Sequence, residues 1–570
     1  MGAGQKRSRP ESSSDDKVSA SGLESGSGAP STSAMSFIRP PILRSAALTA
    51  SATLNKALFT ETFEIAAARV HDNRLISKFQ KALTGTQELL KAERIAPVAD
   101  DPETISTETP GQAKSPQRRK CLLLNPTVSP TAPDSWSDVL KQAVEKKELG
   151  VIPYKLTLDY DYWTSRDVLV SVLPEEFHDD IPTGFNTAGH VAHLNLRDRF
   201  QPYKYIVAQV LLDKNANLRT VINKVDLVGT ESVFRTFPYE VLAGPDDMDV
   251  EVRENMCTFR FDYSKVYWNS KLEPEHSRLL YMFKPGEVVV DLMSGIGPFA
   301  VPAGKRGVFV WANDMNPNSY EAMQDAIHRN KVGAYVRPFN EDGLVFIHKS
   351  ADLVREASAA GNSALEVSET TAPNKPPPLK QQKQQQKLTS AAAPAAPAAA
   401  AATSTKEPKA KGNLTKKPAA ERKRVHVPPT ISHFVMNLPA SATTFLPHFK
   451  GLYAGHEDLF KPTSDSDSEE KPRLPIVHVH CFAPKLDDQS IPKGEVCERV
   501  SGELGVQMTL CETYAEIEQD DPVAEEPKNL VYVHNVRAVA PHKSMFCASF
   551  RIPAAVAFAP REEQTEQKAE

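Results

Sequence analysis

The sequence predicts two small α+β domains followed by an α/β domain built around a mainly parallel sheet. A chain of 570 residues exceeds the roughly 250 residues at which a single core stops growing, so two or three domains are expected. Between residues 41 and 260 short apolar runs alternate with turn residues. After Asp262 apolar strands alternate with helical patterns, which is typical of a parallel sheet.

Composition narrows the class of protein. The 67 lysines and arginines against 72 acids give a formal charge of −5, which argues against a uniformly basic nucleic-acid-binding surface but leaves a local basic face open. No apolar run approaches the roughly 20 residues of a membrane helix, and no signal peptide opens the chain. We therefore expect a soluble, intracellular protein without membrane contact. The six cysteines show no zinc-binding spacing, so we expect reduced thiols and no metal site.

The N-terminal segment has two interpretations. Residues 1–40 are rich in Ser and Gly and are predicted to form a disordered tail. Residues 35–60 contain arginines but no acids, as an organelle presequence does, although an ordinary segment that packs on the next helix fits equally well. Met35 offers an internal start, and Lys6–Arg9 is either a nuclear address or a solvated charge run.

The first domain is predicted to span residues 41–176 and the second residues 177–260. In the first, apolar residues near helical spacing predict a helix over Ala66–Ile95, and short strands follow from Lys120 onward. In the second, two strand-like runs flank an amphipathic helix. These elements are residues 190–196, Tyr203–Leu211 and Leu218–Val228.

The α/β domain is predicted in two parts, residues 261–350 and 429–556. A helix near Ser277–Phe283 precedes the first strand, and a helix near residues 491–504 precedes the last two strands, which we expect to pair as an antiparallel edge. The predicted strands are Val288–Asp291, Val308–Asp314, residues 433–439, residues 476–482, Leu530–Ala538 and Met545–Phe550. Residues 557–570 are expected to form a disordered tail.

Residues 351–428 interrupt the α/β domain. They contain low-complexity runs such as PPPLKQQKQQQK and AAAPAAPAAAAA, which a compact sheet cannot use. We interpret them as a disordered insertion between the third and fourth strands. The basic residues near its end form either a solvated tether or an auxiliary RNA contact; they are Lys416, Lys417, Arg422, Lys423 and Arg424.

A glycine-rich turn follows the first strand of the α/β domain. In the run DLMSGIGPF that begins at Asp291, Gly295 and Gly297 allow a ligand to approach the backbone beside a helix N-terminus. A lone GxG is weak evidence, because a tight turn without a ligand uses the same residues. A nicotinamide cofactor would require the longer GxGxxG.

Polar residues follow the next strands. Asp314 lies 23 residues after Asp291, where a carboxylate can accept both hydroxyls of a ribose. Asp342 and Gly343 lie at the end of the segment that follows the second strand of the α/β domain. An acid at this position can bind an adenine amino group, although Asp-Gly is also a common turn. These acids favour an adenine nucleoside without a pyrophosphate, for which S-adenosylmethionine is the candidate. Asn437, in an NLP sequence at the end of the fourth strand, can donate and accept at the edge of a purine.

Eight separated blocks resemble the tRNA (guanine-N1)-methyltransferases of eukaryotes and archaea, which act on guanosine 37 next to the anticodon. The resemblance covers roughly residues 55–555 apart from the insertion. The blocks are AAARVHDNRLISKF (66–79), HVAHLNLRDRFQPYKYIVAQVLLDKN (190–215), VFRTFPYEVLAG (233–244), FRFDYSKVYWNSKLEPEH (259–276), DLMSGIGPFAVPAGKRG (291–307), NDMNPNSYEAM (313–323), HFVMNLPASATTFL (433–446) and VRAVAPHKSMFCASFRIP (536–553).

The resemblance implies a class I (Rossmann-like) S-adenosylmethionine methyltransferase domain, preceded by two domains that bind the anticodon loop and the L-shaped body of a tRNA with G37. It implies transfer of a methyl group to N1 of that guanosine. The residues that match catalytic positions of the family are Arg235, Glu275 and Asn437. Those that match its cofactor-contacting positions are His276, Asp314, Met315, Asp342, Gly343 and Asn437, and the motif itself adds Asp291, Gly295 and Gly297.

Methylation of guanine N1 requires a base and a cation, which the catalytic residues implied by the resemblance can supply. Guanine N1 carries a proton and becomes nucleophilic only when that proton leaves and negative charge gathers on O6. Glu275, if desolvated by the docked base, would have its pKa raised and would accept the proton, while Arg235 would stabilise O6 and Asn437 would hold the guanine edge. Two alternatives stay open: Arg235 and Glu275 form a structural ion pair between domains, or His276 is the base.

Other functions compete with methylation. A tRNA aminocarboxypropyltransferase of wybutosine synthesis resembles the same fold and cofactor, and a non-catalytic tRNA-binding protein would retain the fold with a damaged site. DNA amino-methyltransferases place DPPY or NPPY where this chain has NLP. Phosphate contacts are expected from basic residues of the second domain, namely Arg197, Arg199 and Lys204.

Localisation is expected from the resembled family, and the state of assembly is expected from the sequence pattern. Members of the resembled family serve cytosolic, nuclear and mitochondrial tRNA pools, so the Met1 and Met35 starts lead us to expect this protein in the cytoplasm, the nucleus and the mitochondrial matrix. No heptad or apolar surface stripe argues for a dimer, so we expect a monomer.

Overall fold

The computed structural model describes residues 37–44, 54–105, 119–225, 234–365, 423–461, 472–524 and 527–561. The disorder predicted for the two tails and the insertion falls mainly on residues 1–36, 366–422 and 562–570, which lie outside this set. Met35, Lys6–Arg9 and most of the basic run that ends at Arg424 lie outside it as well.

The chain divides into two compact units. The N-terminal unit contains the described residues between 55 and 181, and the C-terminal unit contains the described residues from 182 onward. A hydrophobic cluster of the N-terminal unit runs from Ala66 to Leu149, and one of the C-terminal unit runs from Ala188 to Ala557. The second cluster continues across residue 260, where the sequence led us to expect a domain boundary.

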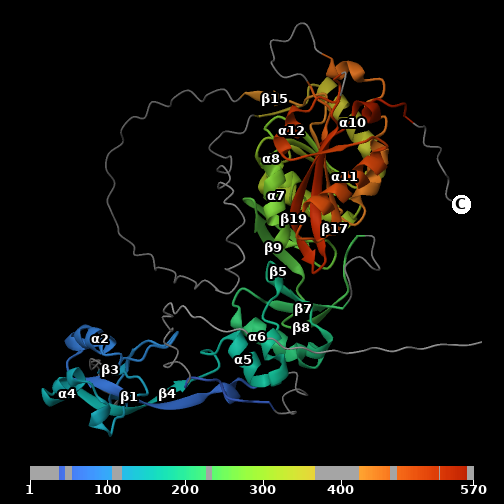
Figure 1. The fold of residues 1–570 in the computed structure, drawn as a ribbon. Helices are drawn as coiled ribbons and strands as arrows, with labels where there is room; N and C mark the ends of the chain where they lie inside the picture. Colours follow the sequence, from blue (N-terminus) through green and yellow to red (C-terminus); the bar gives the residue numbers. More distant parts are fainter. Residues whose placement is uncertain are drawn as a thin grey trace, which may run out of the picture. The chain divides into compact units, whose positions relative to one another are not determined.

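The N-terminal unit is built on a four-stranded antiparallel sheet with the order β2-β3-β1-β4 (Figure 1). Its strands are β1 (Glu61–Val70), β2 (Val98–Asp100), β3 (Lys120–Leu123) and β4 (Leu149–Leu158). Its helices are α2 (Ile76–Gly85), α3 (Pro102–Ile105), α4 (Asp138–Glu145) and α5 (Ser165–Val172). Apolar side chains of α2 and α4 pack with the central strands, and this packing forms the core of the unit.

The helix predicted over Ala66–Ile95 is wrong at both ends. Strand β1 occupies its first residues, and α2 covers only Ile76–Gly85. Alanine favours helices in isolation, but Ala66, Ala67 and Ala68 lie between β3 and β4 and are at most 1% exposed. Pairing with two neighbouring strands overrides the propensity of these residues.

The first part of the C-terminal unit is a four-stranded sheet with the order β5-β6-β7-β8, covered by helix α6 (Lys204–Lys214). Its strands are β5 (Asn186–Ala188), β6 (Val191–Leu194), β7 (Thr220–Lys224) and β8 (Tyr239–Ala243). The strands predicted over residues 190–196 and from Leu218 and the helix predicted over Tyr203–Leu211 are confirmed as β6, β7 and α6, while residues 226–228 of the second predicted strand lie outside the described residues. A hairpin follows, formed by β9 (Asp249–Glu254) and β10 (Cys257–Asp262).

An eight-stranded sheet with the order β13-β12-β11-β16-β17-β20-β19-β18 forms the rest of the unit. Its strands are β11 (Val288–Asp291), β12 (Phe309–Asn313), β13 (Val336–Phe339), β16 (His433–Met436), β17 (Ile476–Pro484), β18 (Thr509–Cys511), β19 (Leu530–Ala540) and β20 (Lys543–Arg551). All neighbours pair in parallel except that β20 is antiparallel to β17 and β19. The predicted parallel sheet and its antiparallel pair are confirmed. β13 stands where the sequence implied a third strand, before Asp342, without giving its bounds, and β18 was not predicted.

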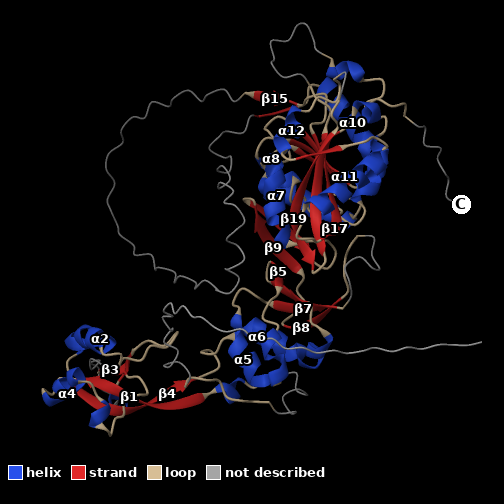
Figure 2. Cartoon of the chain, in the orientation of Figure 1, coloured by secondary structure: helices blue, strands red, loops and turns tan. Residues whose placement is uncertain are grey.

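Helices cover both faces of this sheet, with α7 and α8 on one side and α10 and α11 on the other (Figure 2). The helices are α7 (Glu273–Leu280), α8 (Ala300–Lys305), α9 (Pro317–Asn330), α10 (Gly343–Ala359), α11 (Ser490–Leu504) and α12 (Tyr514–Gln519). Among the described residues, none of the helices combines the length and the apolar character that crossing a bilayer requires. All six cysteines are buried free thiols.

Regular structure extends into both ends of the predicted insertion. Helix α10 continues to Ala359, and β14 (Ser363–Leu365) pairs in antiparallel fashion with β15 (Arg424–His426). The predicted start at residue 351 is therefore too early, because the apolar side of α10, including Ala351 and Val354, is buried in the core.

Candidate functional site

A cavity of about 370 Å³ lies where the loops after β11, β12, β13 and β16 meet. The chain order of the sheet reverses between β11 and β16, and open α/β sheets bind ligands at the carboxyl ends of the strands at such a point. The lining residues from these loops are Leu292, Met293, Gly295, Asp314, Met315, Asn316, Ser319, Asp342, Gly343, Leu344, Asn437, Leu438, Ser441 and Phe445; Phe234, Arg235 and Tyr267 complete the wall.

The two glycines of the turn after β11 have different roles. Gly295 has a φ of +55° and lines the cavity, and a Cβ atom there would meet nothing within 4 Å. Gly297 has a φ of +90°, a value that favours glycine, and a Cβ atom there would lie 3.0 Å from Val301 Cγ2. Gly297 is not among the residues that line the cavity, so it shapes the turn rather than a binding surface.

The acids after β12 and β13 both belong to the cavity wall. Asp314 accepts hydrogen bonds from the backbone N–H of Gly295 (2.7 Å) and of Asn316 (2.9 Å), and burial raises its pKa above the ordinary value despite these bonds. Asp342 caps helix α10 by accepting from the N–H of Leu344 (2.8 Å). An ionised carboxylate has about four acceptor positions, so each acid retains acceptor capacity toward the cavity.

The wall fits an adenine nucleoside with an attached amino acid. The cavity volume lies in the range of small-molecule sites. Its wall combines the carboxylates of Asp314 and Asp342, which can accept hydrogen bonds from ribose hydroxyls and an adenine amino group, with apolar side chains such as Leu292 and Phe445. The residues that would hold S-adenosylmethionine are therefore Gly295, Asp314, Met315, Asp342, Gly343 and Asn437.

Asp291 lies behind this wall. The residue is completely buried, and neither carboxylate oxygen has a hydrogen-bond partner among the described residues. Burial, together with the charge of Asp314, raises the pKa of Asp291 to about 8. Asp291 directly precedes Leu292 and Met293, which line the cavity, so a positive charge bound there would favour its ionised form.

Arg235 reaches the cavity from the segment before β8. Its guanidinium lies over the ring of Tyr267, 4.4 Å from the ring centre, and its φ of +59° is uncommon for a residue other than glycine. Strained backbone of this kind clusters at functional sites. Asn437, the other predicted catalytic residue in the wall, immediately follows β16.

Glu275 does not lie in the wall, and without a docked base its pKa is lowered rather than raised. Arg278, one helical turn further along α7, donates to both carboxylate oxygens at 2.7 Å, and His480 Nε2 lies 2.7 Å from Oε1. Although burial alone would raise the pKa of Glu275, the hydrogen bonds and charges of Arg278 and His480 lower it well below the ordinary value. Within the described chain these are the ion pairs of Glu275, so the alternative pair with Arg235 does not form.

Cys547 completes a buried group with Glu275 and His480. The ligand atoms of the three residues lie within 4.8 Å of one another. The Arg278 guanidinium already contacts both carboxylate oxygens, so a metal ion placed there would meet a like charge.

His276 lines a smaller cavity of about 50 Å³ that shares Tyr267, Met293, Gly295 and Asn437 with the larger one. Its Nδ1 lies 2.5 Å from Oε1 of Glu254, the last residue of β9. Sequence reasoning missed Tyr267, Glu254 and His480. Tyr267 stands inside a block that resembles the family, whereas the contacts of Glu254 and His480 join separate elements and leave no sequence signal.

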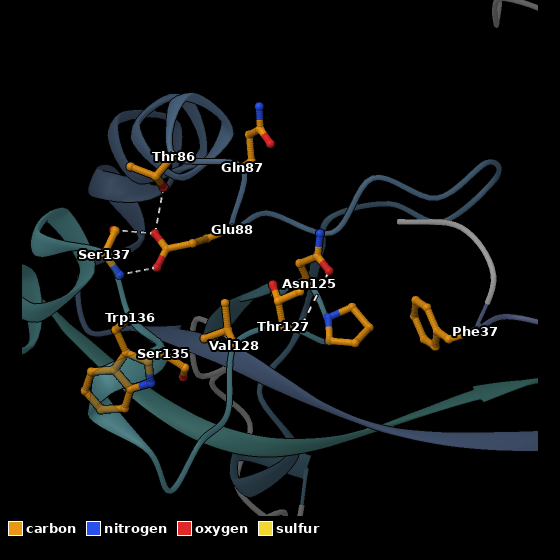
Figure 3. A pocket seen from close by; sticks show the side chains of 11 residues that line it. Phe37, Thr86, Gln87, Glu88, Asn125, Thr127, Val128, Ser135, Trp136 and Ser137 are labelled. Atoms are coloured by element: carbon orange, nitrogen blue, oxygen red, sulfur yellow. Dashed lines mark hydrogen bonds between the residues drawn. The ribbon is translucent and has the colours of Figure 1, made fainter. Parts of the chain in front are cut away.

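The N-terminal unit has a larger cavity of about 590 Å³ (Figure 3). Its one charged lining residue, Glu88, accepts hydrogen bonds from the Ser137 N–H (2.7 Å), the Ser137 hydroxyl (2.5 Å) and the Thr86 hydroxyl (2.6 Å). Because these contacts connect the start of α4 to the end of α2, the carboxylate has a structural role. The smaller cavities of the C-terminal unit carry the better candidates for chemistry.

Known proteins match this chain over most of its length. Residues 250–356 match the TRM5/TYW2 methyltransferase domain, and residues 165–247 match the TYW2 N-terminal domain. The tRNA (guanine(37)-N(1))-methyltransferase of Neurospora crassa is 53% identical over 536 residues, which are 94% of this chain and 98% of the relative. The enzyme of the same name from Fusarium vanettenii is 50% identical over 91% of this chain and 97% of the relative. The crystal structure of wild-type Trm5b from Pyrococcus abyssi is 16% identical, with a TM-score of 0.45, and aligns with 86% of this chain and 99% of that chain.

Proposed function

This chain belongs to the tRNA (guanine(37)-N1)-methyltransferase family, and we infer that it is an S-adenosylmethionine-dependent enzyme that methylates N1 of guanosine 37 in tRNA. The observation that carries this conclusion is 53% identity over 98% of a relative with that name. The cavity at the switch point of the sheet supplies the acceptors that an adenosyl cofactor requires.

Two wall residues are proposed to act on the guanine. When bound, S-adenosylmethionine supplies a methyl group on a positively charged sulfur. Arg235 stabilises the negative charge that develops on O6, in a cavity where a fixed cation is worth more than it is in water. Asn437 holds the guanine edge with an amide that donates and accepts at once.

Glu275 is the proposed base only after it leaves its buried partners. While Arg278 and His480 hold the carboxylate, its lowered pKa makes it a weak proton acceptor, and it does not reach the cavity. Separation from Arg278 would raise the pKa of Glu275 toward a useful value. His276 is a second candidate, favoured by its place in the wall of the smaller cavity.

Methylation is favoured over aminocarboxypropyl transfer. The domain match covers both TRM5 and TYW2 proteins, but the relatives that align with nearly the whole chain are named as guanosine 37 methyltransferases.

Lys204, one of the expected tRNA contacts, is paired with Glu240 at 2.6 Å, which leaves it less available to phosphate. We also propose that the protein is a monomer, which sedimentation would test. Its distribution between cytoplasm, nucleus and mitochondrial matrix is a further proposal, which tagged Met1 and Met35 forms would test.

The test is methyl transfer from labelled S-adenosylmethionine to unmodified tRNA with G37, followed by nucleoside analysis. We expect 1-methylguanosine with G37, no product with a G37→A tRNA, and a sharp loss of product in Glu275→Gln and Asn437→Ala. Transfer of an aminocarboxypropyl group, or a labelled nucleoside other than 1-methylguanosine, would overturn the reaction named here.

A further inference from the structure

A buried carboxylate stands behind His276. Glu254 ends strand β9 and His276 lies on the first turn of α7, and both side chains are 4% exposed. Their contact, between Oε1 and Nδ1 at 2.5 Å, joins the first strand of the β9–β10 hairpin to the helix that follows the hairpin. The ring of His276 also packs edge-on against Phe299 of the glycine-rich turn.

This contact fixes which nitrogen of the ring faces a ligand. A carboxylate accepts hydrogen bonds and cannot donate them when ionised, so Nδ1 carries the proton. Nε2 has no hydrogen-bond partner among the described residues and is not sealed off from solvent. It is therefore the polar atom that His276 offers to the small cavity.

The position of the small cavity identifies the end of the cofactor that it can take. The two cavities share Tyr267, Met293, Gly295 and Asn437, whereas Asp314 and Asp342, the proposed contacts of ribose and adenine, line only the larger one. A volume of about 50 Å³ admits one small polar group, since a water molecule takes about 30 Å³ of liquid volume. The amino acid end of S-adenosylmethionine presents two such groups, a carboxylate and an ammonium.

Charge distinguishes between these two groups. Arginine and lysine are absent from the lining of the small cavity, and the Glu254 carboxylate contacts the ring of His276, which belongs to that lining. The Glu254 carboxylate on this side favours a cation, and Nε2 of a ring whose single proton is on Nδ1 accepts from an ammonium.

We propose that Glu254 is a positioning residue that holds His276 as an acceptor for the α-ammonium group of the cofactor. The inference rests on the proposed use of S-adenosylmethionine. It adds a residue that no sequence motif marked and assigns the small cavity to a single functional group.

The experiment measures ligand binding by calorimetry without tRNA, in wild-type protein and in Glu254→Gln, which keeps the shape and removes the charge. The probes are S-adenosylhomocysteine, decarboxylated S-adenosylmethionine, which keeps the amino group, and methylthioadenosine, which lacks the amino acid end. We expect Kd to rise about tenfold for the first two and to stay unchanged for methylthioadenosine. Glu254→Asp should recover part of the loss, and Glu254→Gln should add nothing in a His276→Ala background.

Glu251→Gln, on the same strand but exposed, is the matched control and should bind all three ligands as wild type does. An equal loss for methylthioadenosine would mean that Glu254 merely supports the fold, and a loss confined to S-adenosylhomocysteine would assign the cavity to the carboxylate. Either result, or unchanged binding of all three ligands by Glu254→Gln, would overturn the inference while leaving the proposed function intact. If wild-type protein bound none of the ligands, the proposed function would fall and this inference with it.

Discussion

Arg235 lines the cavity and has a strained backbone conformation. A φ of +59° costs a residue with a Cβ atom about 1 kcal/mol relative to glycine. Arg235→Gly should therefore raise the free energy of unfolding by about that amount and lower kcat/KM for tRNA methylation by about 100-fold, the usual effect of losing one charge-stabilising group. Thermal unfolding and steady-state kinetics measure the two effects.

Lys331 provides the control for this prediction. It caps helix α9 with the same φ of +59° and does not line the cavity. Lys331→Gly should stabilise the protein without loss of activity. Full activity in Arg235→Gly would show that the strained residue does not act on the guanine.

Asp291 makes stability depend on pH in a direction unusual for an acid. Burial and Asp314 keep its folded pKa near 8, whereas the unfolded chain releases the proton near pH 4. The contribution of this group is complete below about pH 4 and is lost as the pH rises toward 8. Asp291→Asn removes this loss, so in cofactor-free protein the Tm advantage of the variant should grow by about 4 °C or more between pH 5 and pH 8.

An exposed acid separates this effect from general charge removal. Asp325→Asn, on the surface of α9, should leave the pH dependence of Tm as it is in wild type. A constant Tm difference between Asp291→Asn and wild type across this pH range would mean that Asp291 is ionised in the folded protein.

The contact between Glu275 and Arg278 distinguishes the two candidate bases. A base must be deprotonated to act, and a neighbouring cation typically lowers a carboxyl pKa by 1–3 units. If Glu275 is the base, Arg278→Met raises its pKa and moves the acidic limb of the kcat profile to higher pH by about one unit or more. If His276 is the base, the limb stays in place. Arg329→Met, which removes an exposed arginine from α9, is the control.

At the scale of elements, sequence patterns found those whose signal is local. The apolar run before Asp291 and the turn that follows it give strand β11 and the glycine-rich wall, because a short buried strand followed by glycines has few other conformations. The helix over Ala66–Ile95 failed because the pairing partners of β1 lie far away in sequence. The pairs Glu254–His276 and Glu275–His480 were inaccessible for the same reason: each joins elements that only the folded sheet brings together.

The pairing of β14 and β15 predicts that residues 366–423 are dispensable for catalysis. Leu365 lies opposite Arg424 in this antiparallel pair, so a two-residue turn can connect them directly, and Asn-Gly is the sequence best suited to such a turn. Replacing residues 366–423 with Asn-Gly should leave the Tm, the cofactor Kd and the kcat close to wild type. An Asn-Pro replacement, which disfavours this turn type, serves as the control, and a large rise in KM for tRNA would instead show that the replaced residues contact RNA.

At the scale of the whole molecule, the two hydrophobic clusters share no residue, so each unit has a core of its own. A chain of residues 182–570 retains both cavities of the methyltransferase site. It should therefore fold, unfold in one transition and bind S-adenosylhomocysteine with the Kd of the full chain. If the N-terminal unit contributes a second hold on tRNA, its removal should raise KM for tRNA by at least about tenfold, because linked binding modules gain affinity from their connection. Loss of cofactor binding in the shorter chain would show that the N-terminal unit supports the site, and an unchanged KM would show that it does not bind tRNA.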